Sequence, residues 1–238
     1  VTDDNLKNYV VYVNDVERTG LSGWRIPLSG LDGTIEVTVV AEDLAGNVTT
    51  ESRSLKVDVT KPEIGEINIK PANGEGALRV GTGSDRWGHF YTSDAIVEVY
   101  VSDPGVSSGI KQVNYRFGVS GEVGTLALKD GNTVQYLLKQ GFKDNIQFQI
   151  VDNVGHYSNW YGPDGVVVEA TAPRLAFTAP TAAGTSSDGL PIYTNGVNVS
   201  VVATDTGSGL ASIGFNGAVQ NIGLNGAGLT SPFTAVTR

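Results

Sequence analysis

Residues 41–64 read AEDLAGNVTTESRSLKVDVTKPEI and give the clearest indication of the fold. It predicts a strand that ends in an Asp-x-x-Gly-Asn turn, then a second strand, then a break at Asp58-Val59-Thr60-Lys61-Pro62. Asp and Gly favour tight turns, and a proline fixes its own φ and keeps the preceding residue extended. The stretch therefore indicates a β-hairpin followed by a stiff linker.

The composition of the chain favours many short strands. It has 238 residues, of which 40% are hydrophobic, with 31 Gly and 9 Pro, and we find no apolar run with the spacing and length of a helix. A chain of this size can bury a core and should hold one to three domains. We therefore expect an all-β protein.

Charge and cysteine content exclude several classes of function. A formal net charge of −9 without a Lys/Arg cluster opposes binding to nucleic acid or to an anionic membrane surface. No stretch is long and apolar enough to span a bilayer, so no direct membrane insertion is expected. The absence of Cys excludes disulfides, thiolate metal sites and Cys nucleophiles.

A repeat of roughly 100 to 110 residues runs through the sequence. Phe90–Asp103 aligns without gaps on Ile192–Asp205, and both stretches alternate apolar with polar residues, as half-buried strands do. Each is followed by Ser-Gly and an apolar residue, at Ser108 and at Ser208. The front halves of two repeats are thus recognisable.

The start of the chain and the back halves fit the same frame. Residues 1–13 place Asp3 like Asp103. The correspondences of the back halves are 35–47 with 144–156 and 55–64 with 166–175, which put Pro62 and Pro173 at equivalent boundaries. The quoted stretch is therefore the last hairpin of one repeat plus the linker to the next.

These motifs resemble the tandem bacterial immunoglobulin-like repeats of large cell-surface proteins, of adhesin or surface-layer type. The residues that carry the likeness are the "AEDLAGN" hairpin, the "VDVTKP" linker and the "SDPGVSSGI" and "TDTGSGL" turns. The resemblance implies tandem immunoglobulin-like β-sandwiches in an extended array, extracellular, at a bacterial cell surface or cell wall. Residues 1–60 would be an N-terminally truncated repeat, 61–171 a complete repeat and 172–238 a C-terminally truncated repeat.

The expected role is non-catalytic, as a stalk or spacer. The chain opens at Val1, and we expect it to be an excised piece whose partners are neighbouring domains and a host or cell-surface protein or glycan. The alternatives are a surface-layer lattice subunit, a carbohydrate- or ligand-binding adhesin module, and a spacer of an extracellular polysaccharide-acting enzyme. The predicted core residues are Val37, Val39 and Ala41 in one sandwich and Val97, Val99, Ile146, Phe148 and Ile150 in the next.

Two short motifs spell catalytic patterns but are interpreted as turns. Gly105–Gly109 fits G-x-S-x-G around Ser107, yet a nucleophile elbow needs a strand before it and a helix after it. Asp205 opens an Asp-Thr-Gly-Ser tetrad, yet aspartic-protease chemistry needs two carboxylates that share one proton. Its equivalent, Asp103, belongs to another repeat. Turns that use Asp and Gly explain both patterns.

The histidines and tryptophans offer weaker alternatives. His156 takes the place of Asn47 in the repeat, which favours a turn residue over a ligand or a base, and His89 has no second candidate ligand nearby. A sugar-stacking platform of tryptophans is disfavoured because they fall at unrelated places in the frame. These tryptophans are Trp24, Trp87 and Trp160.

Calcium at the first linker is the sharper alternative. Some adhesin repeats similar to these hold Ca²⁺ at their junctions, and Ca²⁺ requires hard oxygen ligands. The candidate ligands are Asp43, Asn47 and Asp58. The competing interpretation is that Asp43 and Asn47 bond their own turn and that Asp58 is solvated. No cofactor is required; a structural calcium ion is the one option left open.

Overall fold

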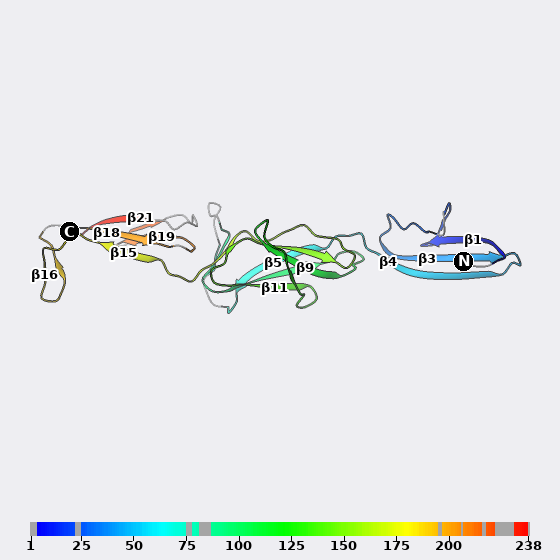
Figure 1. The fold of residues 1–238 in the computed structure, drawn as a ribbon, viewed down its shortest axis with the longest axis horizontal. Helices are drawn as coiled ribbons and strands as arrows, with labels where there is room; N and C mark the ends of the chain where they lie inside the picture. The colour runs from blue at the N-terminus through cyan, green and yellow to red at the C-terminus, as the bar shows by residue number, and fades with distance from the viewer. Residues whose placement is uncertain are drawn as a thin grey trace. The chain divides into compact units, whose positions relative to one another are not determined.

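The computed structural model describes an all-β chain (Figure 1). The described residues are 4–21, 25–74, 78–80, 87–194, 197–205, 207–215, 218–221 and 231–237. Strands form several small sheets within these residues, and none of these residues is helical. The all-β prediction is therefore confirmed.

The chain divides into two compact units. Unit 1 comprises Val1–Gly65, Val101–Asn114 and Gln149–Asn159, and unit 2 comprises Glu66–Tyr100, Tyr115–Phe148 and Trp160–Arg238. The predicted boundary at residue 60 falls in the irregular stretch between two strands, and so does the one at residue 171.

Unit 1 contains a four-stranded antiparallel sheet in the order β2-β1-β3-β4. Its first hairpin turns at Asn14 and Asp15, whose φ values of 49° and 62° are left-handed. Two such residues suit the two-residue hairpin turn that matches the twist of the strands. The strands are β1 (Leu6–Val13), β2 (Val16–Arg18), β3 (Gly33–Asp43) and β4 (Val48–Val57).

One face of this sheet is apolar but only partly enclosed. Val11 pairs with Val39 and Val13 with Val37, so these side chains share a face. Val11 and Val13 are buried, whereas Val37, Val39 and Ala41 are half-buried. The prediction that Val37, Val39 and Ala41 form a buried core is therefore wrong in degree. Alternation determines which face is apolar, but not how fully that face is covered.

The remaining strands of the described residues form six further sheets. Their orders are β10-β9-β13, β11-β8-β5, β12-β14-β7-β6, β15-β18-β21, β16-β17 and β19-β20, and β14 pairs with β7 in parallel. The bounds are β5 (Glu63–Pro71), β6 (Leu78–Val80), β7 (His89–Tyr91), β8 (Ala95–Ser102), β9 (Ile110–Phe117), β10 (Gly124–Leu126), β11 (Thr133–Leu138), β12 (Lys143–Asp144), β13 (Ile146–Asp152), β14 (Val166–Val168), β15 (Arg174–Thr178), β16 (Gly184–Thr185), β17 (Pro191–Ile192), β18 (Val197–Thr204), β19 (Ser212–Phe215), β20 (Ala218–Asn221) and β21 (Ser231–Thr237).

The second predicted core is fully buried. Each of its five residues has no exposed surface, and these are Val97, Val99, Ile146, Phe148 and Ile150. They alternate along β8 and β13, as one face of a strand requires. The strand order β10-β9-β13 also matches β2-β1-β3, in agreement with the predicted equivalence of β9 with β1 and of β13 with β3.

Candidate functional site

The linker after β4 binds its surroundings through one carboxylate. Oδ2 of Asp58 accepts a hydrogen bond from the backbone N–H of Ser108 at 2.8 Å, and Oδ1 accepts one from the N–H of Thr60 at 3.1 Å. The Thr60 hydroxyl lies 2.9 Å from Asp58 Oδ1 and 2.9 Å from the carbonyl oxygen of Pro104. Asp58 is 9% exposed, so both of its oxygens exchange water for protein donors.

These hydrogen bonds favour the charged carboxylate. Contact with Ser108, and then the hydrogen bonds from Thr60, lower the pKa of the Asp58 carboxyl to about 2, against the opposing effect of burial. Donors that point at a carboxylate stabilise its ionised form. The linker is thus held by a buried anion rather than by a solvated side chain.

The loop between β8 and β9 supplies the donor to Asp58 and is itself built around a carboxylate. Asp103 Oδ2 accepts hydrogen bonds of 2.8 Å from the Gly109 N–H and from the Ser107 hydroxyl. Gly109 has a φ of +89°, a conformation that glycine adopts without the clash of a Cβ. Asp103 Oδ1 and Ser108 Oγ are buried without a hydrogen-bond partner. The loop is therefore tightly turned and presents its backbone N–H to the linker.

The turn after β13 adds a second buried carboxylate. Asp152 has no exposed surface, and its Oδ1 accepts hydrogen bonds from the N–H groups of Val154, Gly155 and His156 at 3.0, 2.6 and 2.8 Å. Its Oδ2 lies 2.8 Å from Nδ1 of His156. Burial acts to raise the pKa of Asp152, but the hydrogen bonds from His156 and Gly155 lower it, and the net shift is downward.

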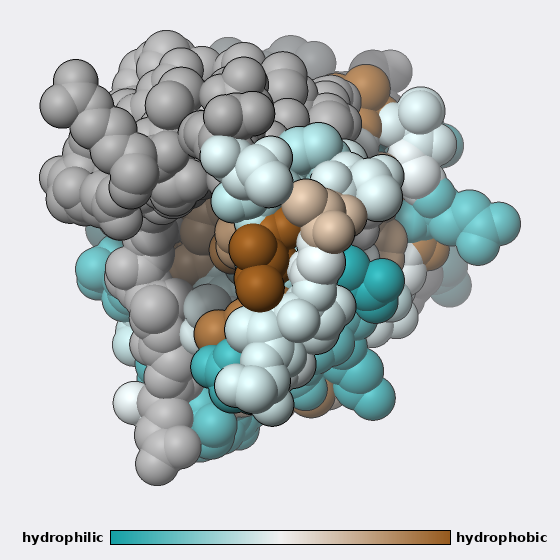
Figure 2. All heavy atoms as spheres, turned by 90° about the vertical axis from the view of Figure 1, so that its left-hand side faces the viewer, coloured by the Kyte–Doolittle hydropathy of each residue, from teal (hydrophilic) through white to brown (hydrophobic). Residues whose placement is uncertain are grey.

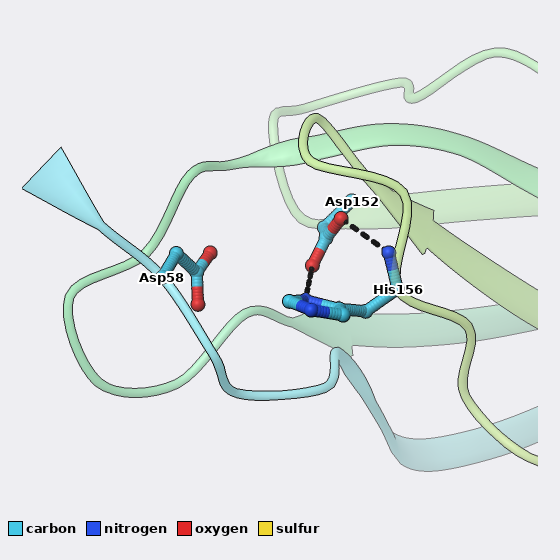
Figure 3. Close-up of side chains that lie close together, drawn as sticks. All are labelled: Asp58, Asp152 and His156. Atoms are coloured by element: carbon cyan, nitrogen blue, oxygen red, sulfur yellow. Dashed lines mark hydrogen bonds and ion pairs between the residues drawn. The ribbon is translucent and has the colours of Figure 1, made fainter. Parts of the chain in front are cut away.

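Asp58, Asp152 and His156 come together in unit 1 (Figure 3). One donor atom of each lies within 4.8 Å of the others. Two carboxylates and an imidazole are groups that bind divalent cations, and here Nδ1 of His156 already lies against Oδ2 of Asp152. The oxygens of both carboxylates already accept hydrogen bonds, so the same arrangement is also stable with these hydrogen bonds alone.

The three predicted calcium ligands do not converge on one ion. Asp43 and Asn47 flank the turn at one end of the β3–β4 hairpin, whereas Asp58 follows β4 at its other end. A strand of ten residues spans about 33 Å. The three-residue site is therefore not formed, because the hairpin separates its members.

Asp43 and Asn47 instead form the predicted turn. Asp43 Oδ1 accepts hydrogen bonds of 2.8 Å from the N–H groups of Ala45 and Asn47, and the Asn47 amide donates to Oδ2 at 2.7 Å. This side-chain bond, with the backbone bonds, lowers the pKa of Asp43. His156 bonds Asp152 in the same way, so its predicted place as a turn residue equivalent to Asn47 is confirmed.

The second linker repeats the arrangement of the first. Glu169 Oε1 accepts from the Thr171 N–H at 2.5 Å, and Oε2 accepts from the Ser208 N–H and hydroxyl at 3.4 and 3.2 Å. Asp205 Oδ1 accepts from the Gly209 N–H at 2.7 Å, as Asp103 does from Gly109. Lys143 also donates to the carbonyl oxygen of Gly207 at 2.6 Å. Each linker therefore holds a loop farther along the chain, around Ser108 or around Ser208, by an acidic side chain.

The residues of the catalytic-looking patterns take part in these turns. Ser107 lies between two strands, and its hydroxyl donates to Asp103. Asp205 is buried and bonds its own loop. His89 begins β7, where it pairs with Val166 and Val80. The turn interpretation accounts for Ser107 and Asp205.

The tryptophans lie in separate surroundings. Trp87 is buried beside Phe90 and Val167, whereas the Arg116 guanidinium lies 4.1 Å from the centre of the Trp160 ring. Trp24 and Asp3 lie outside the described residues.

Several large apolar side chains in the last part of the chain are 46% to 68% exposed. Figure 2, which faces the end that carries β16, shows hydrophobic atoms among hydrophilic ones on that face. The exposed residues of this part are Leu175, Phe177, Leu190 and Ile192.

No protein-family model and no curated protein matches the chain. Among the described residues, no helix has the length and apolar character needed to cross a membrane. The sequence did not reveal that Asp58 lies near Asp152 and His156, because these two residues lie far along the chain. A signal for Ser108 was present, since the repeat places a Ser-Gly pair at 108 and again at 208.

Proposed function

We propose that the chain is a non-catalytic structural spacer built of tandem immunoglobulin-like β-sandwich repeats. It would serve as the stalk of a bacterial surface protein, outside the cell, and carry neighbouring domains toward a host or cell-surface protein or glycan. The resemblance of its hairpin and linker motifs to such repeats supports this role. The proposal concerns a mechanical function, so it must be supported at the linkers.

The proposal rests on a contact that recurs at both linkers. We call this contact the clasp: an acidic linker side chain that accepts hydrogen bonds from a serine of a distant loop and from the threonine two residues after the acidic residue. Asp58 and Glu169 occupy equivalent linker positions, and each accepts a hydrogen bond from the backbone N–H of an equivalent serine, Ser108 or Ser208. Each also accepts from the threonine two residues later. A catalytic centre has no need to recur at successive linkers, whereas a spacer does, because every joint must resist bending.

The linker prolines support the same role. Pro62 follows the clasp within four residues and is buried, and its ring restricts both its own φ and the conformation of Lys61. A short extended linker that is also hydrogen-bonded to the loop around Ser108 has little freedom to bend. We infer that the clasp and the proline act together to hold the linker in one conformation.

Small-angle X-ray scattering of the full chain tests the spacer function. A compact single globule of 238 residues has a radius of gyration of about 18 Å, and an array of repeats should exceed this value clearly. Asp58→Ala combined with Pro62→Gly should broaden the distribution of particle dimensions. Asp43→Ala, at the far end of the same hairpin, is the matched control and should leave it unchanged. A radius of gyration near that of a compact globule would reject the spacer.

A further inference from the structure

The strand β4 (Val48–Val57) is the outer strand of its sheet in unit 1 (Figure 1). It is ten residues long, and all but the last of them are exposed, on both faces of the strand. It pairs with β3 residue by residue without a bulge, and it contains no proline. A short length, a bulge or a proline commonly protects the edge of a sheet from pairing, and β4 has none of these.

The pairing with β3 determines which backbone groups of β4 point outward. Opposite residues of an antiparallel pair alternate between those that exchange hydrogen bonds and those that do not. The N–H of Asp43 donates to the carbonyl oxygen of Asn47 at 3.0 Å, so the odd-numbered residues of β4 bond to β3 and the even-numbered ones turn their N–H and C=O groups to the free edge. Ser52 agrees with this assignment. Its hydroxyl lies 2.8 Å from that of Thr38, directly opposite, and its carbonyl oxygen accepts a hydrogen bond from the Arg53 guanidinium.

The side chains that flank Ser52 make one register of self-pairing complementary. Glu51 and Arg53 share a face of β4, their charged groups lie 3.6 Å apart, and their side chains are 70% and 81% exposed. If two copies of β4 run antiparallel with Ser52 opposite Ser52, Glu51 of each copy lies opposite Arg53 of the other. The same register aligns the outward N–H and C=O groups of the two edges, for about ten hydrogen bonds.

Three other arrangements are disfavoured. Parallel pairing in register would set Glu51 beside Glu51 and Arg53 beside Arg53, and like charges opposite each other destabilise a sheet. Antiparallel pairing about either of these residues would also oppose like charges, and it would bring together backbone groups that are already bonded to β3. A second copy paired about Ser52 therefore fits the edge in both charge and hydrogen bonding.

We propose that the free edge of β4 is a self-association surface, at which two copies of the chain pair antiparallel about Ser52 and join their four-stranded sheets. The net charge of −9 opposes the association of two chains. The edge itself does not share this repulsion, because β4 carries one acidic and two basic side chains, Glu51, Arg53 and Lys56. The inference concerns contact between chains, so it goes beyond the spacer role and does not rest on it.

Charge reversal tests the register. Analytical ultracentrifugation of the full chain over a concentration series should show a monomer–dimer equilibrium. Glu51→Arg alone, or Arg53→Glu alone, opposes like charges at both symmetric positions and should raise the dimer Kd by about tenfold or more. An equal mixture of the two variants should recover the native Kd within about threefold, because opposite charges then face each other again at both positions. The repulsion between positions 51 and 53 within each chain persists in the mixture, so recovery comes from contact between the copies.

A proline at the centre of the edge tests the backbone pairing. Ser52→Pro removes an N–H that points to solvent, which an edge strand tolerates, so it should abolish the dimer and leave the β3–β4 pairing intact. Ser52→Thr keeps the N–H and is the matched control. In the native chain, hydrogen exchange at the amides of Thr50, Ser52 and Ser54 should slow by about tenfold or more as the concentration rises through Kd, while the amides of Thr49 and Glu51 should not change.

Three outcomes would overturn the self-association surface. They are a chain that stays monomeric over the whole concentration series, a dimer that Ser52→Pro leaves intact, and a mixture of the two charge variants that associates no better than either variant alone. If Ser52→Pro unfolds the sheet, the mixture still decides, since it alters no backbone group. Scattering on the linkers can be measured at concentrations below Kd, so the two proposals can be rejected separately.

Discussion

Residues 35–64 and 144–175 are equivalent stretches of the sequence repeat, and they share the hydrogen bonds of their turns and linkers but neither their strand pairing nor their burial. Asp43 and Asp152 close the same turn, with the fourth residue after each bonded to the second carboxylate oxygen. Asp152 has no exposed surface, while Asp43 is only half-buried. The local motif thus determines which donors meet which acceptors, whereas the packed neighbours determine how much each bond contributes.

The largest contrast is expected in the two cores. Phe148→Ala should lower the free energy of unfolding of its region by about 3–5 kcal/mol, because it leaves a cavity among fully buried side chains. Val39→Ala, at the equivalent position of the first copy, should cost about 1 kcal/mol, because Val39 is only half-buried. Residue-resolved hydrogen exchange in a urea series measures both.

Val119→Ala is the control for this pair, since Val119 is 73% exposed. It should change the free energy of unfolding by less than about 0.5 kcal/mol. An equal cost for Val39→Ala and Phe148→Ala would show that the face of β1 and β3 is as enclosed as that of β13. The difference drawn between the two copies would then be wrong.

The second largest contrast is expected between the two linkers, in how strongly each acidic side chain protects the serine amide that it binds. Asp58 accepts from Ser108 N–H at 2.8 Å, whereas Glu169 accepts from Ser208 N–H at 3.4 Å through a longer and more mobile side chain. Asp58→Ala should therefore speed exchange of the Ser108 amide by about tenfold, and Glu169→Ala should speed that of Ser208 by less than about threefold.

Asp58→Asn provides the conservative control for the linker. It keeps one acceptor oxygen but turns an amide NH₂ toward either Ser108 or Thr60, so its effect should lie between those of the native residue and alanine. If Glu169→Ala had the larger effect, the shorter and more buried clasp would not be the stronger one.

The local parts of this molecule were predictable from sequence, and the parts made by packing were not. The turn at Asp43 and the linker at Pro62 depend on residues within a few positions of each other, so the local sequence alone indicates them. The meeting of Asp58 with Asp152 depends on how the linker lies against a distant turn, which no spacing encodes. The pattern of Val37, Val39 and Ala41 specified a face, but not what covers it.

Acid should weaken the first linker in a defined pH window. The pKa of Asp58 is lowered from 3.8 to about 2 in the folded chain, so its contribution to stability is complete above pH 3.8 and is lost as the pH falls through about 2. Carboxyl-carbon NMR should report this low pKa, and protection of the Ser108 amide should fall over the same range. Asp58→Ala should remove this step. A pKa of Asp58 near 3.8 would show that the hydrogen bonds of the clasp are not maintained in solution.

The smallest effect is expected from calcium. Both oxygens of Asp58 and of Asp152 already accept hydrogen bonds from N–H groups, and an ion at the first linker would have to compete with these donors. Ca²⁺ also prefers six to eight oxygen ligands, whereas His156 offers nitrogen. Thermal unfolding midpoints in millimolar CaCl₂ and in excess chelator should therefore agree within about 1 °C, a shift that corresponds to a few tenths of a kcal/mol or less. Asp43→Ala serves as the control for the turn at the far end of the hairpin. A calcium-dependent rise of several degrees that Asp58→Ala abolishes and Asp43→Ala preserves would establish an ion among Asp58, Asp152 and His156. The first linker would then differ from the second in kind, because Glu169 would be the only clasp that works by hydrogen bonds alone.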